Sequence, residues 1–456
     1  MMRRVMITAM VAFWVAIATP AEAAERTVTP VDDLASIIEA ASPGDRVILR
    51  PGKYKGPVKI TKSVTLEGES GAAIIGDGKG TVVTIDAAGV TLRGLEIGGS
   101  GTNLEGMDSG VFATENATGA LIERNRVTGN LYGIYVHGAA DSLVRKNTVI
   151  GLKKGHMSEL GNGIAVWNAP GAKIIDNDIS FGRDGIFTIA SKRNVFSGNT
   201  FHDVRFAIHY MYTNNSEIRG NTSIGNAVGY ALMFSNKLKV IGNLSDGDRD
   251  HGLVLNFANG SQIEGNTVIG RMQPQSRWTT AGNHDPADKM PSDDSPTSPN
   301  ANLSGERLGP EKCVFIYNAN KNRLKGNRFD GCSIGIHFTA GSEGNSISGN
   351  AFINNRNQVK YVGTRYLDWS VDGHGNYWSD NPAFDLDGDG LGDNAYRPND
   401  VMDKVMWTAP QAKVLATSPA VQVIRWAQAQ FPALLPGGVV DSHPLMAPPT
   451  QGRPVQ

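Results

Sequence analysis

Short stretches in which apolar and polar residues alternate recur along the chain, and many of them open on a glycine. Examples are Gly133–Val136, Gly163–Val166, Gly185–Thr188 and Gly335–Phe338. Alternation with a period of two is typical of β-strands, and no helix-length periodicity separates these stretches. The pattern predicts many short strands with turns rich in Gly, Asn and Asp between them.

An asparagine recurs at a nearly constant step through the strand-rich region. The recurring positions are Asn125, Asn147, Asn177, Asn199, Asn221, Asn243, Asn266, Asn327 and Asn350. The steps are 22, 30, 22, 22, 22, 23, 61 and 23 residues, so the two long steps are a coil with an insertion of 8 or 39 residues. A fixed step of this size predicts a solenoid. We expect an all-β, right-handed parallel β-helix of about 22 residues per coil over residues 24–360, with insertions near 152–160 and 271–310.

The asparagines are expected to form a ladder in which stacked side chains bond one another and tolerate a left-handed turn. We expect this ladder to be structural. Two cysteines, Cys313 and Cys332, fall in neighbouring coils, which makes a disulfide plausible.

Both ends of the stack carry segments that differ from the coils. The segment Asp33–Ala41 predicts an amphipathic helix that caps the first coil. Residues 361–400 hold an Asp-rich loop, and residues 401–456 are expected to hold a last helix and a proline-rich tail. This helix either plugs the open end or reaches a partner or membrane, and both alternatives stay open.

The first 23 residues have the features of a secretory signal. Arg3 and Arg4 precede the apolar stretch Val5–Thr19, and Ala21–Ala23 offers a small-residue cleavage site. We therefore expect an exported protein. A net charge of −1 from 43 basic and 44 acidic residues argues against a nucleic-acid partner, which normally requires a basic excess.

Aligning the coils on their glycines separates inward from outward residues. Those expected to point inward are Ile134, Val136, Ile164, Val166, Ile208 and Ile336. The outward set is unusually apolar and comprises Tyr135, His137, Trp167, Phe187, Ile189, His209, Met211, Met233, Phe315, Tyr317 and His337. We call these eleven residues the strip. Large apolar patches mark interfaces, so the strip predicts a surface for a partner or for an insertion of this chain.

Imidazoles and thioethers gather on the strip and in both insertions. These side chains suit soft metals, Cu(I) above all. The copper candidates are His156, Met157, His209, Met211, Met233, His284 and Met290, although their spacing matches no fixed motif.

The segment Asp385–Asp393 has acidic residues at the first, third, fifth and ninth positions of a calcium-type loop. The expected ligands are Asp385, Asp387, Asp389 and Asp393. The twelfth position is Tyr396 in place of the bidentate glutamate, so the loop is not a complete EF-hand. We expect a structural Ca²⁺ site completed from elsewhere, with a plain acidic turn as the alternative.

Many solenoids of this kind act on polysaccharides, so an enzyme must be weighed. The best candidate cluster is Asp246, Asp248, Arg249, Asp250 and His251, but four of these residues lie in a Gly/Asp-rich turn where charge is common. We expect a non-enzymatic protein, with a polysaccharide lyase or epimerase as the alternative.

Four segments of the C-terminal third carry a family resemblance. Together with the exported coils, Gly375–Trp378, Asp385–Asp393, Asn394–Pro398 and Asp441–Met446 resemble the NosD family of periplasmic β-helix proteins. The resemblance implies a non-enzymatic role beside an ABC-type ATPase and a membrane permease in loading copper into nitrous oxide reductase. It further implies that the strip receives a copper chaperone or the reductase, and that the C-terminal helix meets the permease at the inner membrane.

Overall fold

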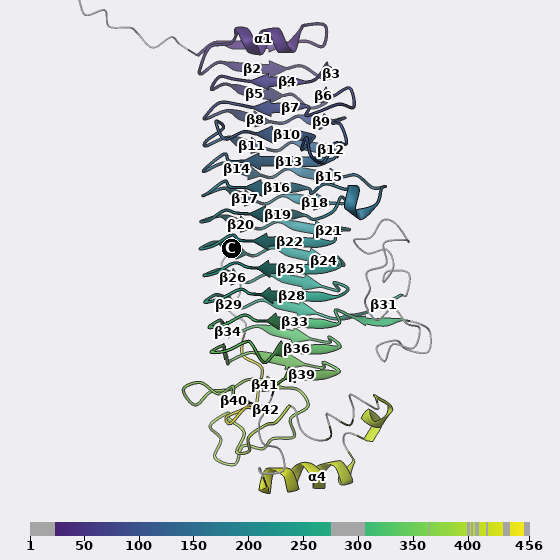
Figure 1. Ribbon diagram of the computed structural model, residues 1–456, viewed down its shortest axis with the longest axis vertical. Coiled ribbons are helices and arrows are strands. Elements are labelled where there is room, and N and C mark those ends of the chain that lie inside the picture. Colours follow the sequence, from purple (N-terminus) through teal and green to yellow (C-terminus); the bar gives the residue numbers. More distant parts are fainter. Residues whose placement is uncertain are drawn as a thin grey trace, which may run out of the picture.

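The computed structural model describes residues 23–274, 306–363, 365–398, 410–415, 418–431 and 438–450, together with Met402 and Val405. Within these residues, short strands stack into three long parallel sheets, which we call A, B and C, of 13, 13 and 12 strands (Figure 1). Each coil contributes one strand to each sheet. The predicted parallel β-solenoid is confirmed, while its right-handed sense stays a prediction.

The strands of the three sheets are two to six residues long. Sheet A comprises β1 (Glu25–Val28), β2 (Arg46–Leu49), β5 (Thr65–Gly68), β8 (Thr91–Arg93), β11 (Leu121–Glu123), β14 (Leu143–Arg145), β17 (Lys173–Ile175), β20 (Val195–Ser197), β23 (Glu217–Arg219), β26 (Lys239–Ile241), β29 (Gln262–Glu264), β34 (Arg323–Lys325) and β37 (Ser346–Ile347). Sheet B comprises β3 (Gly52–Lys55), β6 (Ala72–Ile75), β9 (Glu96–Gly98), β12 (Arg126–Asn130), β15 (Thr148–Gly151), β18 (Asp178–Ser180), β21 (Thr200–His202), β24 (Thr222–Ile224), β27 (Leu244–Asp246), β30 (Thr267–Ile269), β35 (Arg328–Asp330), β38 (Ala351–Ile353) and β41 (Tyr377–Trp378). Sheet C comprises β4 (Val58–Ile60), β7 (Val83–Ile85), β10 (Ser109–Ala113), β13 (Tyr132–His137), β16 (Ile164–Trp167), β19 (Ile186–Ile189), β22 (Phe206–Met211), β25 (Val228–Met233), β28 (His251–Asn256), β33 (Lys312–Tyr317), β36 (Ile334–Thr339) and β39 (Asn357–Val362).

One continuous hydrophobic core runs through the coils. The six residues predicted to point inward are all buried in it. Identical core types stack in register, as Ile134 does on Ile164 and Val136 on Val166. Each fully buried aliphatic side chain contributes about 2 kcal/mol, so the stack gains stability coil by coil.

Glycine opens many strands of sheet C because the backbones there approach closely. A Cβ added at Gly133 would lie 2.4 Å from both the Gly163 carbonyl oxygen and Val149 Cγ1. Gly163 and Gly185 are similarly confined by neighbouring coils. The glycines that mark the repeat are therefore packing positions.

The asparagine ladder is confirmed and is buried. From Asn125 to Asn350, each backbone N–H and each side-chain Nδ2 donates to Oδ1 of the next ladder asparagine at 2.8–3.1 Å. Asn376 adds a further rung. The expectation of a left-handed backbone at the ladder asparagines was wrong: the positive φ falls one residue earlier, for example at Arg124 and Gly198. Placing the turn there leaves the asparagine side chain pointing inward.

Both insertions leave the stack at the same corner, where sheet B passes to sheet C. The short one lies between β15 and β16 and contains the 3₁₀ helix η1 (Met157–Glu159). The long one lies between β30 and β33 and begins and ends in the antiparallel hairpin of β31 (Arg271–Gln273) and β32 (Arg307–Gly309). Gln273 Nε2 anchors this hairpin by donating to the Gly247 carbonyl at 2.6 Å.

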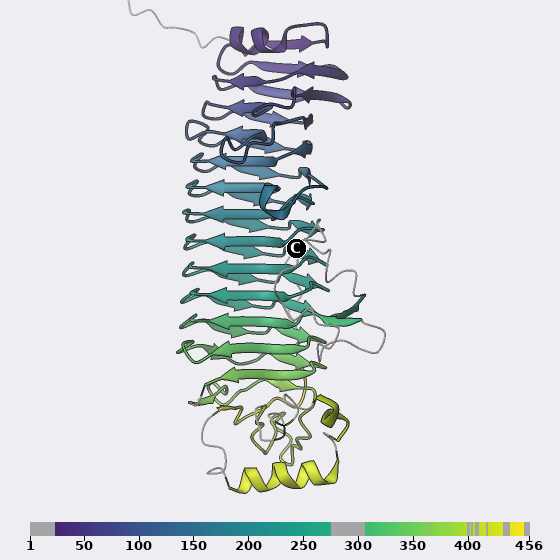
Figure 2. The ribbon, with the colours of Figure 1, turned by 45° about the vertical axis from the view of Figure 1, so that its right-hand side comes forward.

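Different elements lie at the two ends of the described stack. Helix α1 (Leu34–Ala40) lies at the N-terminal end and buries Leu34 and Ile38 in the core (Figure 1); its capping role stays a prediction. Beyond β41, the strand β40 (Tyr366–Asp368) pairs with β42 (Gly438–Val440). The 3₁₀ helix η2 (Pro410–Leu415) and helix α4 (Pro419–Gln430) lie at the C-terminal end (Figure 2). The predicted signal segment lies outside the described residues, apart from Ala23.

The two cysteines form a disulfide that links neighbouring coils. Cys313 on β33 bonds Cys332, which precedes β36, with their Cα atoms 5.7 Å apart. Both side chains are fully buried. The disulfide that the sequence made plausible is therefore present.

Candidate functional site

The outer face of sheet C carries all eleven residues of the strip. The strand register arranges them in two columns. One column runs through Tyr135, Phe187, His209, Phe315 and His337, and the other through His137, Trp167, Ile189, Met211, Met233 and Tyr317. The strip therefore spans the outer face from Tyr135 to His337. Ala165, Ala231 and Val254 lie between its members in the first column, and Asn256 does so in the second.

Aromatic contacts hold the strip together along the axis of the solenoid. The rings of His137 and Trp167 stack with centroids 4.3 Å apart, and Phe315 lies 5.2 Å from His337. Trp167 and Tyr317 are the most exposed members, at 38 % and 42 %. Such aromatic side chains are frequent hot spots of protein interfaces.

His209 was expected on the exposed strip, but it is 8 % exposed. Its Nδ1 lies 3.1 Å from Asp184 Oδ2, and the Arg205 guanidinium donates to both carboxylate oxygens of Asp184 at 2.8 Å. Burial alone would raise the pKa of Asp184, but Arg205 and His209 more than offset burial and hold it well below its usual value. The carboxylate is therefore ionised at neutral pH.

His337 of the strip and the nearby His251, which is not a strip residue, both carry imidazoles that are neutral at pH 7. Burial lowers the pKa of His337 to about 4, and Lys360 adds to the shift. Burial and Lys312 lower the pKa of His251 in the same way, also to about 4. At the other end, burial raises the pKa of Tyr135 to about 12. The face is apolar in its chemistry as well as in its composition.

Sequence reasoning missed three further parts of this face. Phe112 and Phe206 extend the aromatic contacts, to Tyr135 at 5.4 Å and to His209 at 4.9 Å. Val228, Ala231 and Val254 form a small buried cluster of their own outside the main core. The cluster could have been found from the sequence, because the alignment of the coils assigns Ala231 and Val254 to outward positions of β25 and β28.

The third missed part is a ridge of aromatic residues in the turns that leave sheet C. Tyr212, Phe234 and Phe257 stack with centroids 5.2 Å apart and are followed by Tyr317 at 5.9 Å. The first three have φ of 48–50°, which is costly for bulky side chains. They recur at the coil step one residue past the strip, a signal that the alignment on alternate residues passed over.

The remaining copper candidates do not gather on the strip. His156 and Met157 belong to the short insertion, where His156 Nδ1 lies 3.1 Å from Ser158 Oγ. His284 and Met290 lie outside the described residues. Of the seven candidates, sheet C brings together His209, Met211 and Met233.

The charged cluster weighed as a catalytic site is engaged in structural contacts. Asp246 pairs with Arg271 at the base of the hairpin, and Arg249 pairs with Asp250 at 2.8 Å. Asp248 is fully buried and accepts hydrogen bonds from Ser223 and Ser245. Burial raises its pKa to about 7. These contacts serve the fold and give no support to the enzyme alternative.

The Asp-rich loop gathers three of its four expected ligands. One oxygen of each of Asp385, Asp387 and Asp389 lies within 4.8 Å of the others. Asp385 also accepts from the Gly390 amide at 2.9 Å. Asp393 instead accepts from the Leu386 amide at 2.8 Å. Three convergent carboxylates fit a hard cation such as Ca²⁺.

Helix α4 turns its apolar side outward. Val421 is buried, while Val423, Ile424 and Trp426 are 63 %, 41 % and 64 % exposed. Among the described residues, none of the helices has the length and apolar character needed to span a bilayer. Helix α4 is a second candidate docking surface.

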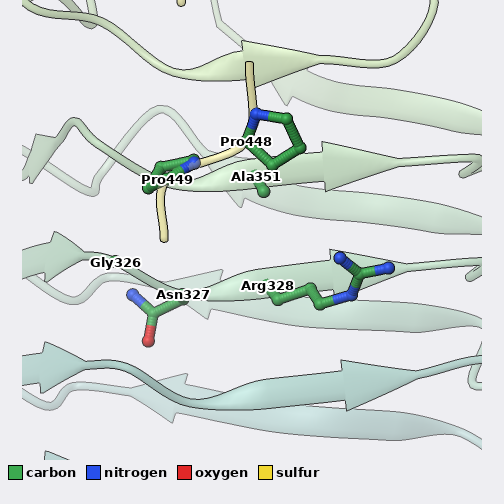
Figure 3. Close-up of a pocket in the computed structure, with 6 residues that line it drawn as sticks. All are labelled: Gly326, Asn327, Arg328, Ala351, Pro448 and Pro449. Atoms are coloured by element: carbon green, nitrogen blue, oxygen red, sulfur yellow. The ribbon is translucent and has the colours of Figure 1, made fainter. Parts of the chain in front are cut away.

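The end of the described chain returns along the outside of the solenoid. Pro448 and Pro449 lie beside Ala351 of β38, above the coil that carries Asn327 and Arg328 (Figure 3). The six residues that line the hollow between them include no cluster of catalytic groups.

A family model described as "Periplasmic copper-binding protein (NosD)" matches residues 150–383. A protein of Stutzerimonas stutzeri named "Probable ABC transporter binding protein NosD" is 38 % identical over 403 residues, which cover 88 % of this chain and 87 % of that protein. The chain belongs to the NosD family. A Pseudomonas aeruginosa protein of the same name is also 38 % identical, over 92 % of both chains.

Membership of the NosD family places the protein in the periplasm, as the signal predicted. The names of its relatives point to a non-enzymatic binding protein with transporter subunits as partners. Solved structures are similar in fold alone. The Dettilon tailspike protein has a TM-score of 0.53 at 16 % identity, covering 74 % of this chain and 69 % of that one. The A-module of the Azotobacter vinelandii mannuronan epimerase AlgE6 has 0.51 at 15 %, covering 72 % and 90 %.

Proposed function

We propose that this NosD-family protein is a non-enzymatic accessory of an ABC-type transporter that supports assembly of the copper site of nitrous oxide reductase. The outer face of sheet C is its docking platform for a copper chaperone or the reductase. The observation that carries the platform is the strip, because its aromatic rings and imidazoles follow neighbouring coils from β13 to β22 and return on β33 and β36.

The strip suits docking because its exposed aromatic side chains are held in place by neighbouring rings. Trp167 and Tyr317 present large rings to solvent, yet each is held by a neighbouring ring. Binding to preordered side chains costs little conformational entropy. The ridge of Tyr212, Phe234 and Phe257 widens the same surface, because these three rings stack in the turns directly after β22, β25 and β28.

Capture of partners from a denitrifying host tests the platform. The double variant Trp167→Ala/Tyr317→Ala is expected to lose at least ten-fold of the copurifying chaperone or reductase. Ile224→Ala/Ile241→Ala is the matched control, since these residues are similarly exposed on sheets B and A. Equal capture by the two double variants would refute the platform.

We propose that helix α4 contacts the permease at the inner membrane. Its exposed apolar residues lie at the C-terminal end of the stack, away from the coils (Figure 2). Ile424→Ser/Trp426→Ser should abolish copurification of the permease and its ATPase. Val31→Ser is the control, because Val31 is 93 % exposed at the opposite end.

We further propose that Asp385, Asp387 and Asp389 hold a structural Ca²⁺. The Asp389 amide lowers the pKa of Asp387, but the carboxylates around it outweigh this effect and raise the pKa above its usual value. A bound cation would relieve that repulsion. Ca²⁺ should raise the melting temperature of the wild-type protein and leave Asp385→Asn/Asp387→Asn unchanged; an equal response of both proteins would exclude the site.

A further inference from the structure

We infer that His209, Met211 and Met233 form a binding site for Cu(I) on the outer face of sheet C. The inference deepens the proposed function and rests on it, since copper would be the cargo handled there. It reduces the seven copper candidates to the three that the fold places together. It also adds Asp184 and Arg205, which orient His209.

The first step is the orientation of His209. Asp184 accepts from Arg205 through both carboxylate oxygens, so the imidazole Nδ1 of His209, 3.1 Å from Asp184 Oδ2, is the donor of that contact. Arg205 fixes Asp184 through two bonds of 2.8 Å. Nε2 is therefore the ring nitrogen left to bind a ligand. A carboxylate on the remote nitrogen is the usual partner of a metal-binding histidine.

The second step concerns the surroundings of His209 Nε2. It is buried and has no hydrogen-bond partner within the part of the chain that the structure describes. Phe187 and Phe206 lie against the ring, with centroids 5.1 and 4.9 Å away. Leaving a buried nitrogen unpaired is destabilising, and a ligand that binds Nε2 would remove this cost.

The third step is the position of the two thioethers. Met211 follows His209 by two residues on β22, so both side chains point to the same face. Met233 on β25 is the register partner of Met211, and paired strands lie about 4.8 Å apart. The residue opposite His209 is Ala231. It is buried in a small cluster against which both Phe206 and Met233 pack. Methionine has three rotatable bonds, so both sulfurs can turn toward Nε2.

The chemistry of these donors selects the ion. One imidazole and two thioethers form a soft ligand set without a carboxylate, which suits Cu(I). The charge of Asp184 is compensated by Arg205 and so adds no anionic ligand. The apolar walls disfavour strongly hydrated ions such as Zn²⁺ or Ca²⁺, because losing their water is costly.

The test is anaerobic titration of the purified full chain with Cu(I) against a chromophoric Cu(I) chelator. The wild-type protein should bind one Cu(I). Met211→Leu/Met233→Leu, which keeps the side-chain volume, should bind at least ten-fold more weakly. His209→Gln retains a donor for Asp184 and should also weaken binding. Met272→Leu/Met446→Leu changes two exposed methionines and is the matched control.

A second readout uses protein labelled with ¹³C at the methionine methyl groups and Ag(I) as a diamagnetic probe. Two methyl resonances should shift with Ag(I), and both should be missing from the Met211→Leu/Met233→Leu spectrum. Cu(I) affinity that is equal in this variant and the control would overturn the site. Capture of partners is measured separately from Cu(I) affinity. If the wild-type protein captures its partners but binds no Cu(I), the site is wrong and the docking platform stands. If it binds Cu(I) but captures no partner, only the platform is contradicted.

Discussion

The carboxylate of Asp441 accepts a hydrogen bond from the indole Nε1 of Trp378 at 2.8 Å and another from the Asn376 amide at 2.6 Å. Asn376 is the last asparagine of the ladder, so Asp441 takes the place of the next rung. It comes from a segment 65 residues further along the chain. The last coil is therefore completed by the C-terminal segment and not by another repeat.

Replacing Asp441 should loosen this end of the solenoid. Asp441→Ala leaves two buried donors unpaired and should cost about 2–4 kcal/mol in unfolding free energy. Asp441→Asn keeps an acceptor at a position that asparagine occupies in every other rung, so we expect it to cost less than half as much. Urea midpoints followed by circular dichroism measure both; equal midpoints for the two variants would contradict the rung.

The centre of the ladder should be as sensitive as its end. Asn221 Oδ1 accepts from Asn199, and its Nδ2 donates to Asn243 and to the Phe196 carbonyl. Asn221→Ala removes these bonds and should cost about 2–4 kcal/mol. Asn116→Ala, at an exposed asparagine, should change the melting temperature little. A comparable loss of stability in both variants would show that the ladder hydrogen bonds contribute no more than those of an exposed asparagine.

Stability should fall as the pH rises through the range in which Asp248 ionises. Its folded-state pKa is about 7, above the ordinary 3.8, because burial disfavours the charge. Between pH 4 and 7 the folded state thus binds more protons than the unfolded state, and unfolding free energy declines with pH by at most about 4 kcal/mol. Asp248→Asn, which fits a position that already accepts from the Asn226 amide, should flatten this slope. Parallel curves for both proteins would assign the slope to other groups.

Breaking the disulfide should destabilise the protein measurably. The bond closes a loop with a sequence separation of 19, for which chain entropy gives about 3 kcal/mol. Reductant should lower the melting temperature of the wild-type protein, while Cys313→Ala/Cys332→Ala should start lower and be insensitive to reductant. A wild-type melting curve unaffected by full reduction would contradict this expectation.

Much of the strip was predictable because sheet C obeys simple rules. Once Gly133 and Gly163 are aligned, the alternation of strands assigns Tyr135 and Trp167 to the outer face without further information. The burial of His209 was not predictable, because it depends on Asp184 and Arg205 from the two preceding turns. Nothing in the repeat marks those two residues as partners.

The sequence by itself determined the solenoid, its coil length, its inward residues and its ladder. Each coil buries its apolar face only against its neighbours, so a local period fixes the contacts of every repeat. The tertiary structure alone decided the closing rung at Asp441, the ion pair that orients His209, and the pairing of Met211 with Met233 on the same face as that imidazole. These features depend on distances between side chains on different coils and segments. Close packing in the folded protein sets those distances, and the sequence repeat does not specify them.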